Sequence, residues 1–369
     1  MKIRNYNPIF PISLILCLVL TFLPLISAFS ADQTMFTESQ KTDLYWVSYQ
    51  GSNKTGGCCP ILLMQIDQFG NIVRPSKVVI PQGKIGIPNR SGTAIMGLDQ
   101  QNLEIWAAHR QTDILRAKIN KETLITISVK KTLVKTSNGS RIQVTQRKEK
   151  NFLTISTATI DGDVLSAFGL QDGLFDGTRW HLSPEFLGDQ GQCFSLSGCG
   201  GGVSSDGQTA FYVLDPTGPK TDLAVQPLGP RGRIHGDAAI VGTTKGGHGI
   251  RAADVTNILV EGKKFVVYVA ARYLGPHNDL PDKLFLQIID AKTGHPLGDR
   301  IDLRTIAGAA VGQSVAIDPL GRFVVFTHFN PTTLSNEMSY QALDGTGHAS
   351  GPLKLLDANG FSGIDILKD

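Results

Sequence analysis

The strongest constraint on the fold of this 369-residue chain is a weak internal repeat. A similar segment occurs six times, in five cases beginning with Gly or Ser. Each ends in a turn, and the first five are followed by a β-rich run. These segments begin near positions 91, 142, 202, 249, 312 and 362, and the second is the poorest match. The period of about fifty residues lies in the range of architectures built from copies of one supersecondary unit.

Each repeat contains enough strand-like sequence for a four-stranded sheet. Residues 284–289 (LFLQII), a polar turn at 290–294 (DAKTG) and residues 300–303 (RIDL) show the second half of such a unit. The runs are rich in β-branched and aromatic residues and are bounded by Gly, Asp, Asn and Pro. No long helical period follows the first thirty residues. We therefore predict an all-β fold.

Four antiparallel strands per repeat predict a β-propeller. The C-terminus supplies one inner strand at 362–366, and the N-terminus supplies three strands at 44–49, 61–66 and 78–80. Pairing the two ends completes one further blade and removes two open sheet edges. We predict a single domain over residues 31–369 with six blades, or seven if residues 120–198 hide an extra one.

Two hairpins resemble those of known propellers. Residues 203–211 (VSSDGQTAF) and 317–326 (IDPLGRFVVF) are similar to hairpins that recur in the TolB/WD40-like and lactonase-like propeller superfamily. Asp and Gly suit the tight turn between the first two strands of a blade. The resemblance implies the architecture and no particular activity, because such folds host unrelated functions. WD dipeptides and the sialidase-type Asp box are absent from the sequence.

Residues 1–30 have the pattern of an export signal. Lys2 and Arg4 precede the uncharged stretch 9–29, and Ala28 and Ser30 place small residues at the two positions that a signal peptidase reads. An uncleaved N-terminal membrane anchor is the alternative, because the apolar run is long enough to span a bilayer. We expect a signal peptide and a secreted or periplasmic protein.

Four cysteines follow the predicted signal, namely Cys58, Cys59, Cys193 and Cys199. An even number of cysteines in an exported chain predicts disulfide bonds. One pairing joins Cys193 to Cys199 and leaves a strained bridge between the neighbours Cys58 and Cys59. The alternative is two bridges that join the two pairs. A zinc site is a third interpretation, although adjacent cysteines suit a tetrahedral ion poorly.

Charge and motifs exclude several classes of function. The formal net charge of +3, of which Lys2 and Arg4 carry two, gives no argument for nucleic acid or an anionic membrane as partner. The sequence has no G-x-S-x-G, H-E-x-x-H or Walker motif. No motif identifies a cofactor, so Ca²⁺ and Zn²⁺ are candidates only through the His and Asp residues considered next.

Propeller topology sorts the connections between strands into two faces. If strands a to d run outward from the channel, the b–c and d–a loops share one face and the a–b and c–d turns share the other. The a–b and c–d turns are short and rich in Asp and Gly, as structural hairpins are. The b–c and d–a loops are longer, contain all four cysteines, and are the expected place for binding.

Candidate site residues come from these loops and the adjoining inner strands. We expect the catalytic or metal-binding candidates to be His248, His277, His328 and Arg251, with Arg251 positioning an anionic group. The ligand-binding candidates are Asn278, Asp279 and Asp254, and the loop 328–337 also holds Asn330 and Glu337. The alternative is that each is a solvated loop residue. The strand-a residues Asp99, Asp254, Asp318 and Asp365 are expected to cap turns.

Two functional hypotheses follow. The first is an exported binding module for a protein, a glycan or a small molecule, held on the cysteine-bearing face. The second is a lactonase-like or carbohydrate-active hydrolase or lyase with a site at the channel mouth. The sequence alone leaves open whether the protein is an enzyme.

Overall fold

A computed structural model gives the fold of the unit Asp43–Asp369. It describes residues 42–51, 60–81, 93–109, 113–135, 141–147, 150–159, 162–171, 174–181, 201–214, 220–229, 234–245, 248–272, 282–306, 314–330 and 332–369. The predicted signal at 1–30 lies outside this part of the chain. No helix among the described residues has the length and apolar character needed to cross a bilayer.

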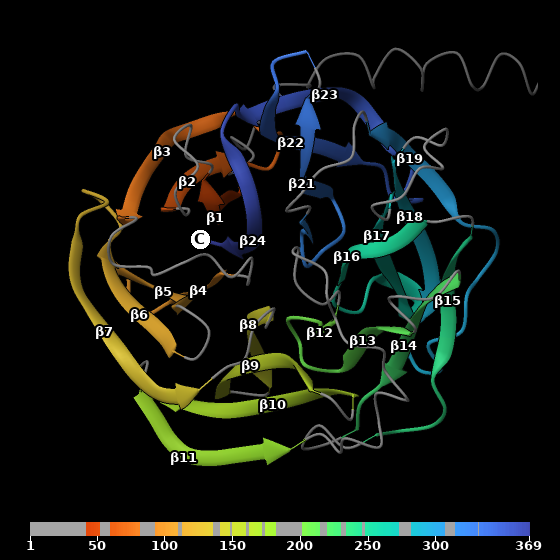
Figure 1. Cartoon of the computed structure of the whole chain (residues 1–369), viewed down its shortest axis with the longest axis horizontal. Helices are drawn as coiled ribbons and strands as arrows, with labels where there is room; N and C mark the ends of the chain where they lie inside the picture. The colour runs from red at the N-terminus through yellow and green to blue at the C-terminus, as the bar shows by residue number, and fades with distance from the viewer. Residues whose placement is uncertain are drawn as a thin grey trace, which may run out of the picture. The chain divides into compact units, whose positions relative to one another are not determined.

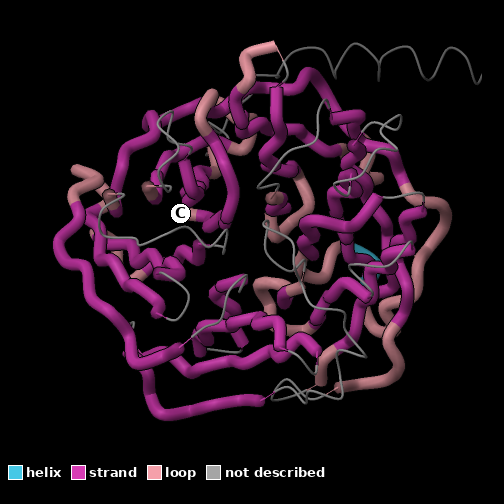
Figure 2. Tube along the Cα trace, viewed as in Figure 1, coloured by secondary structure: helices cyan, strands magenta, loops and turns pink. Residues whose placement is uncertain are grey.

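The β-branched and aromatic runs form strands β1 to β24, which pair into six antiparallel four-stranded sheets (Figure 1). Within the described residues the helical element is a short turn, η4 (Val260–Gly262), and strands make up most of the trace (Figure 2). We number the sheets as blades and give their strands from the inner strand outward.

Blade 1 contains β24 (Gly360–Lys368), β1 (Leu44–Gly51), β2 (Ile61–Asp67) and β3 (Ile72–Ile80). Blade 2 contains β4 (Thr93–Gly97), β5 (Asn102–His109), β6 (Asp113–Asn120) and β7 (Thr126–Lys135). Blade 3 contains β8 (Arg141–Arg147), β9 (Lys150–Thr159), β10 (Gly162–Gln171) and β11 (Leu174–His181). Blade 4 contains β12 (Gly202–Val203), β13 (Thr209–Leu214), β14 (Lys220–Pro227) and β15 (Ala239–Lys245). Blade 5 contains β16 (His248–Val255), β17 (Lys263–Arg272), β18 (Asp282–Asp290) and β19 (Ile301–Ile306). Blade 6 contains β20 (Val315–Ile317), β21 (Phe323–Asn330), β22 (Ser335–Leu343) and β23 (Ala349–Asp357).

The two ends of the chain share blade 1. β24 pairs antiparallel with β1, with Val47 opposite Ile366 and Ser48 opposite Asp365. The inner strands contact one another in the order β24, β4, β8, β12, β16 and β20, and β20 contacts β24 again. This closed ring of six blades confirms the predicted propeller and its shared closing blade.

The core lies between neighbouring blades. Because side chains alternate along a strand, β21 sends Val324 and Phe326 toward blade 5, and Phe323 and Val325 toward blade 1. The middle strands are therefore buried on both faces. Burial on both faces explains why their sequences are nearly continuous apolar runs.

Two of the strand-a aspartates fasten one blade to the next. Oδ2 of Asp365 in β24 accepts the backbone N–H of Ile95 in β4 at 2.8 Å. Oδ2 of Asp254 in β16 accepts the backbone N–H of Ile317 in β20 at 2.9 Å. The prediction that these two residues cap turns is wrong, because their carboxylates reach the inner strand of the neighbouring blade.

The other two aspartates do cap turns, as predicted. Oδ1 of Asp99 accepts the backbone N–H groups of Gln101 and Asn102, both at 2.8 Å. Oδ2 of Asp318 accepts the backbone N–H of Arg322 at 3.2 Å. Both carboxylates satisfy donors of the a–b turn that an unsupported hairpin would leave to water.

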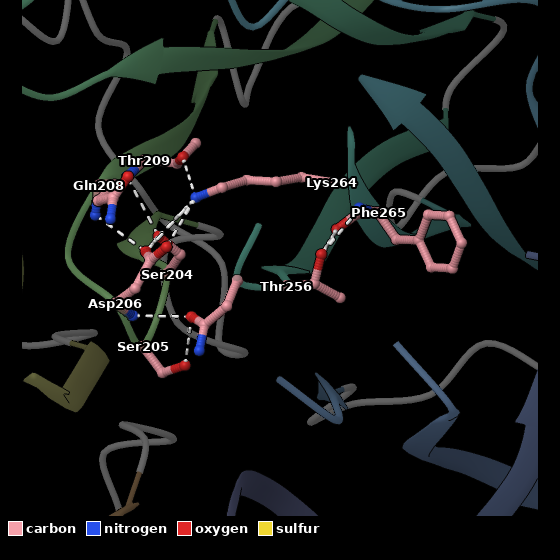
Figure 3. A network of polar contacts seen from close by, with 9 residues as sticks. Ser204, Ser205, Asp206, Gln208, Thr209, Thr256, Lys264 and Phe265 are labelled. Carbon is pink, nitrogen blue, oxygen red and sulfur yellow. Dashed lines mark hydrogen bonds and ion pairs between the residues drawn. The ribbon is translucent and has the colours of Figure 1, made fainter. Parts of the chain in front are cut away.

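A buried lysine fastens blade 4 to blade 5 (Figure 3). Lys264, at the start of β17, has a side chain that is 0% exposed. Its Nζ donates to Oγ1 of Thr209 at 2.6 Å and lies 3.2 Å from Oδ2 of Asp206, both in blade 4. A buried ammonium group is tolerated when it is paired and hydrogen-bonded. The a–b turn of blade 4 supplies these partners, so the network is structural.

Glycines in the c–d turns permit close contact between blades. Gly70, in the β2–β3 turn, has a φ of +75°, and a Cβ at this position would lie 2.6 Å from ring carbons of Tyr340 in blade 6. The Tyr340 hydroxyl donates to the Gln68 carbonyl oxygen in the same turn at 2.7 Å. Gly70 therefore meets both a conformational and a steric requirement.

We predict that Gly70→Ala lowers the free energy of unfolding by about 3 kcal/mol, from left-handed backbone strain plus overpacking against Tyr340. Gly298 is the matched control, because it has a φ of +74° and a Cβ added there would meet no atom within 4 Å. Gly298→Ala should cost about 1 kcal/mol, from the backbone strain alone. Urea unfolding measures both, and equal losses would contradict the steric part.

A second prediction concerns the buried lysine. Lys264→Met should lower the free energy of unfolding by about 3 kcal/mol, because Asp206 and Thr209 lose a desolvated partner. The neighbouring Lys263, which is 44% exposed and pairs with Glu261, is the control. Lys263→Met should move the urea midpoint little, since exposed ion pairs contribute little to stability. Similar midpoints for the two variants would contradict a stabilising role of the contact that Lys264 makes with blade 4.

Candidate functional site

The structure describes only some of the predicted site residues. Cys58, Cys59, Cys193, Cys199, His277, Asn278 and Asp279 lie outside the described residues. His248 and Arg251 belong to β16, and their side chains are outside the described set. Asp254 and His328 are described, and Asp254 is buried and bonded to blade 6 as shown above. The site can therefore be built around His328.

His328 belongs to a group of polar side chains at the b–c end of blade 6. We call His328, Asn330, Glu337 and Ser339 the rim cluster. The expectation that 328–337 forms a loop is wrong for most of its length, because β21 continues to Asn330 and β22 begins at Ser335. Cross-strand pairing puts His328 directly opposite Glu337. The cluster is thus held by a regular sheet.

Strand alternation places the rim cluster on the side of blade 6 that faces blade 5. Phe326, two residues before His328, packs in the apolar core shared with blade 5. Met338, which lies between Glu337 and Ser339, packs in the core shared with blade 1. Because neighbouring residues point to opposite faces, His328, Glu337 and Ser339 share the blade 5 side.

Hydrogen bonds join the members of the cluster. Nε2 of His328 and Oγ of Ser339 are 2.9 Å apart. Nδ2 of Asn330 donates to Oε1 of Glu337 at 2.8 Å, and Oγ1 of Thr333 donates to the same oxygen at 3.3 Å. The second carboxylate oxygen, Oε2, lies 3.9 Å from Nε2 of His328. Glu337 is thereby held in one orientation at the edge of the sheet.

The cluster is partly open to solvent and rests on an aromatic ring. The side chains of His328 and Glu337 are 14% and 11% exposed. The ring of Phe326 lies below His328, with 5.6 Å between the ring centroids. Burial lowers the pKa of His328, despite the opposing charge of Glu337. Burial therefore favours the neutral form of the imidazole.

The geometry does not match that of a serine nucleophile. In a Ser-His-acid triad the hydroxyl and the carboxylate bond to opposite nitrogens of the imidazole. Here Ser339 and Glu337 both approach Nε2 of His328. Ser339 is also only 2% exposed, so its hydroxyl is closed to a substrate arriving from solvent. These side chains form a polar group at the edge of the sheet, and they do not have the arrangement of a nucleophile and its base.

The rim cluster contains a single carboxyl group, that of Glu337. β23, the strand next to β22, contains the acidic residue Asp357, which lies opposite Met338 in the sheet. Asp357 accepts a hydrogen bond from the Tyr49 hydroxyl of blade 1. Glu337 and Asp357 therefore project from opposite faces of the sheet. Most glycoside hydrolases place two carboxyl groups on either side of the scissile bond. The described residues contain no group of three or more His, Cys, Asp or Glu that could hold a metal ion.

Sequence reasoning identified three of the four members of the cluster and missed Ser339. Residues 335–343 (SNEMSYQAL) alternate in direction, with Met338 and Tyr340 turned toward the blade 1 core. The same alternation, continued toward the N-terminal end of the strand, includes Glu337. This pattern in the sequence could have predicted that Glu337 and Ser339 lie on the same face of the sheet.

Comparison with known proteins identifies the architecture. No known sequence family and no curated protein matches the chain. A mutant of the Aleuria aurantia lectin in complex with Fucα1-6GlcNAc matches 86% of this chain and 93% of the lectin, with 10% identity and a TM-score of 0.50. Another structure of that lectin is described as a six-bladed β-propeller with a novel fucose recognition mode.

Two glycosidases give lower TM-scores. An α-L-arabinofuranosidase from Fusarium graminearum with an iminosugar inhibitor matches 72% of this chain and 80% of the enzyme, at 10% identity and a TM-score of 0.47. A thermostable family-43 glycoside hydrolase matches 71% and 93%, at 13% identity and a TM-score of 0.43. At these identities the likeness to the lectin supports the fold alone. The protein is a β-propeller, and the finer resemblance to TolB-like and lactonase-like propellers stays a prediction.

The lowered pKa of His328 predicts how stability depends on pH. A histidine with a lower pKa in the folded state than in the unfolded state binds fewer protons when folded. Its contribution to stability is therefore complete above the unfolded pKa of about 6.5 and is lost as the pH falls through the folded pKa. His328→Gln should remove this loss, so its stability relative to the wild type should rise between pH 7.5 and pH 5.

Urea unfolding at several pH values measures the effect. His295, which is exposed in the β18–β19 turn, provides the control substitution His295→Gln. A His328→Gln curve that runs parallel to the wild-type curve over this range would contradict the prediction.

Proposed function

We propose that this chain is an exported binding propeller that holds a neutral glycan at the rim cluster. The observation that carries the proposal is the combination of hydrogen-bond donors and acceptors around Glu337. Asn330 holds the Glu337 carboxyl group in place, and the rings of Phe326 and His328 are in contact beside it. Sugar hydroxyls both donate and accept hydrogen bonds, and an amide, a carboxylate and an imidazole together offer both functions. A small number of positioned polar groups beside an aromatic surface is typical of ligand sites.

Charge favours a neutral ligand. Burial favours the neutral form of His328, and the rim cluster contains the carboxyl group of Glu337 and no lysine or arginine. An anionic ligand would meet that carboxylate without a counter-charge from the cluster. A neutral sugar can instead donate a hydroxyl proton to it, and charge-assisted hydrogen bonds of this kind are the stronger ones.

The lectin whose fold this chain shares was solved with a fucoside, which supports testing glycans before other ligands. Export rests on residues 1–30, and the bridges among the four cysteines rest on their number. Both stay predictions. The alternative function, a carbohydrate-active or lactonase-like hydrolase or lyase, would need groups beyond the rim cluster, because the cluster lacks an accessible nucleophile and a second carboxylate.

Glycan binding through the rim cluster predicts a specific mutational pattern. On the glycan that gives the strongest signal on an array, Asn330→Ala and Glu337→Gln should each raise Kd at least tenfold, which corresponds to about 1.4 kcal/mol. Titration calorimetry measures Kd, and urea unfolding confirms that each variant is folded.

Asn336→Ala is the matched control, because Asn336 neighbours Glu337 on β22 but lies on the opposite face of the sheet. It should leave Kd unchanged. Equal Kd values for all three variants would overturn the assignment of the cluster. Release of sugar by the wild type, abolished in His328→Gln, would instead favour the hydrolase.

A further inference from the structure

A cleft of about 360 Å³ opens between blades 5 and 6 on the face of the a–b and c–d turns. This is the face opposite to the rim cluster. Its walls are largely apolar and include Leu259, Phe265, Leu320 and Leu343. The volume lies within the range of about 300 to 1,000 Å³ that is typical of ligand pockets.

One wall of the cleft is an unusual loop. The a–b connection of blade 5 covers 256–262, whereas the corresponding connections of blades 4 and 6 cover 204–208 and 318–322. The longer loop contains the turn η4, in which Glu261 has a φ of 65°. A left-handed conformation at a residue other than glycine costs about 1 kcal/mol or more and often marks a functional segment.

This loop exposes aliphatic side chains beside the cleft. Val260 is 86% exposed and Ile258 is 48% exposed. Across the cleft, Leu320 in the a–b turn of blade 6 is 50% exposed. Exposed apolar side chains gathered around a pocket are characteristic of contacts with another protein.

The charged residues that line the cleft already have partners within the chain. Glu261 pairs with Lys263 at 2.7 Å. Arg322 pairs through Nη1 with Asp43 at 2.7 Å and through Nε with Asp318 at 2.9 Å, whereas its Nη2 has no hydrogen-bond partner among the described residues and is buried from solvent.

The remaining charged residue of the lining, Asp344, is also engaged. Its Oδ1 accepts the hydroxyl proton of Thr346 at 2.7 Å and the backbone N–H of His348 at 2.9 Å. A charged ligand would have to compete with these contacts, so an uncharged partner complements the cleft best.

We propose that the cleft is a docking site for a neutral segment of a partner protein, which inserts one apolar side chain between blades 5 and 6. A ligand confined to the cleft would leave Val260 and Ile258 in water, whereas a protein surface would cover them. Interfaces of this kind depend on an apolar anchor in a pocket, surrounded by contacts that exclude water. The inference is independent of the proposed glycan site.

The structure offers a position beside the cleft where a large side chain can be introduced without straining the fold. Gly345 lines the cleft, and a Cβ at this position would meet no atom within 4 Å. Its φ lies outside the left-handed region, so a side chain is tolerated there. Gly345→Phe should occupy the cleft. Gly97, which has the same free space at the end of β4 in blade 2, supplies the control Gly97→Phe.

Binding can be tested with single side chains as probes. N-acetyl-L-leucinamide and N-acetyl-L-tryptophanamide are neutral, and saturation-transfer NMR detects weak binding of such probes to the full chain. We expect transfer to both probes from the wild type and from Gly97→Phe, and at least a fivefold weaker signal from Gly345→Phe. Glycan binding should be unchanged in Gly345→Phe.

Equal signals from all three proteins would overturn the proposal, as would a stronger signal for a charged probe such as N-acetyl-L-lysinamide. Sedimentation of the wild type as a dimer that Gly345→Phe converts to a monomer would also overturn it. That result would assign the cleft to a second copy of this chain.

Discussion

The antiparallel pairing of β24 with β1 is the contact on which the other blades depend. Blades bury apolar side chains on both faces, as β21 does with Val324 toward blade 5 and Val325 toward blade 1. An open row of blades would expose one apolar face at each end, together with unpaired strand edges. Pairing the two ends of the chain in blade 1 covers these apolar faces and pairs these strand edges. The stability of each blade therefore depends on closure of the ring.

Polar contacts fix the distance between neighbouring blades, which apolar packing alone specifies only loosely. Asp365 and Asp254 each bond a backbone N–H of the next inner strand, and Lys264 joins blade 5 to the a–b turn of blade 4. Hydrogen bonds of this kind act at defined distances and directions, whereas apolar contact does not. The inner strands are thereby fixed at the centre of the ring, and the connections at the two faces are free to differ between blades.

The strands and the closed ring were predictable because they depend on local composition and on the repeat. The contacts between blades were not, because the partners are far apart in sequence: the donor to Asp365 is Ile95, and no local pattern pairs them. The rim cluster was predicted in part, since the sequence analysis singled out His328, Asn330 and Glu337 but expected a loop around them. Glutamines at equivalent positions of blades 5 and 6, Gln287 and Gln341, bond carbonyl oxygens of their own c–d segments and form a repeat signal that composition alone conceals.

Blade 6 carries a different chemistry at each of its two ends. β21 is eight residues long, so its ends are separated by about 25 Å of regular strand. At one end the carboxyl group of Glu337 is partly exposed beside other polar side chains. At the other end Arg322 and Asp344 are engaged by contacts within the chain, and the walls of the cleft are largely apolar. Sites so far apart with no shared side chain are expected to act additively. Blade 6 is therefore a rigid sheet whose two ends differ in polarity, and a change at one end is expected to leave the other end unaffected.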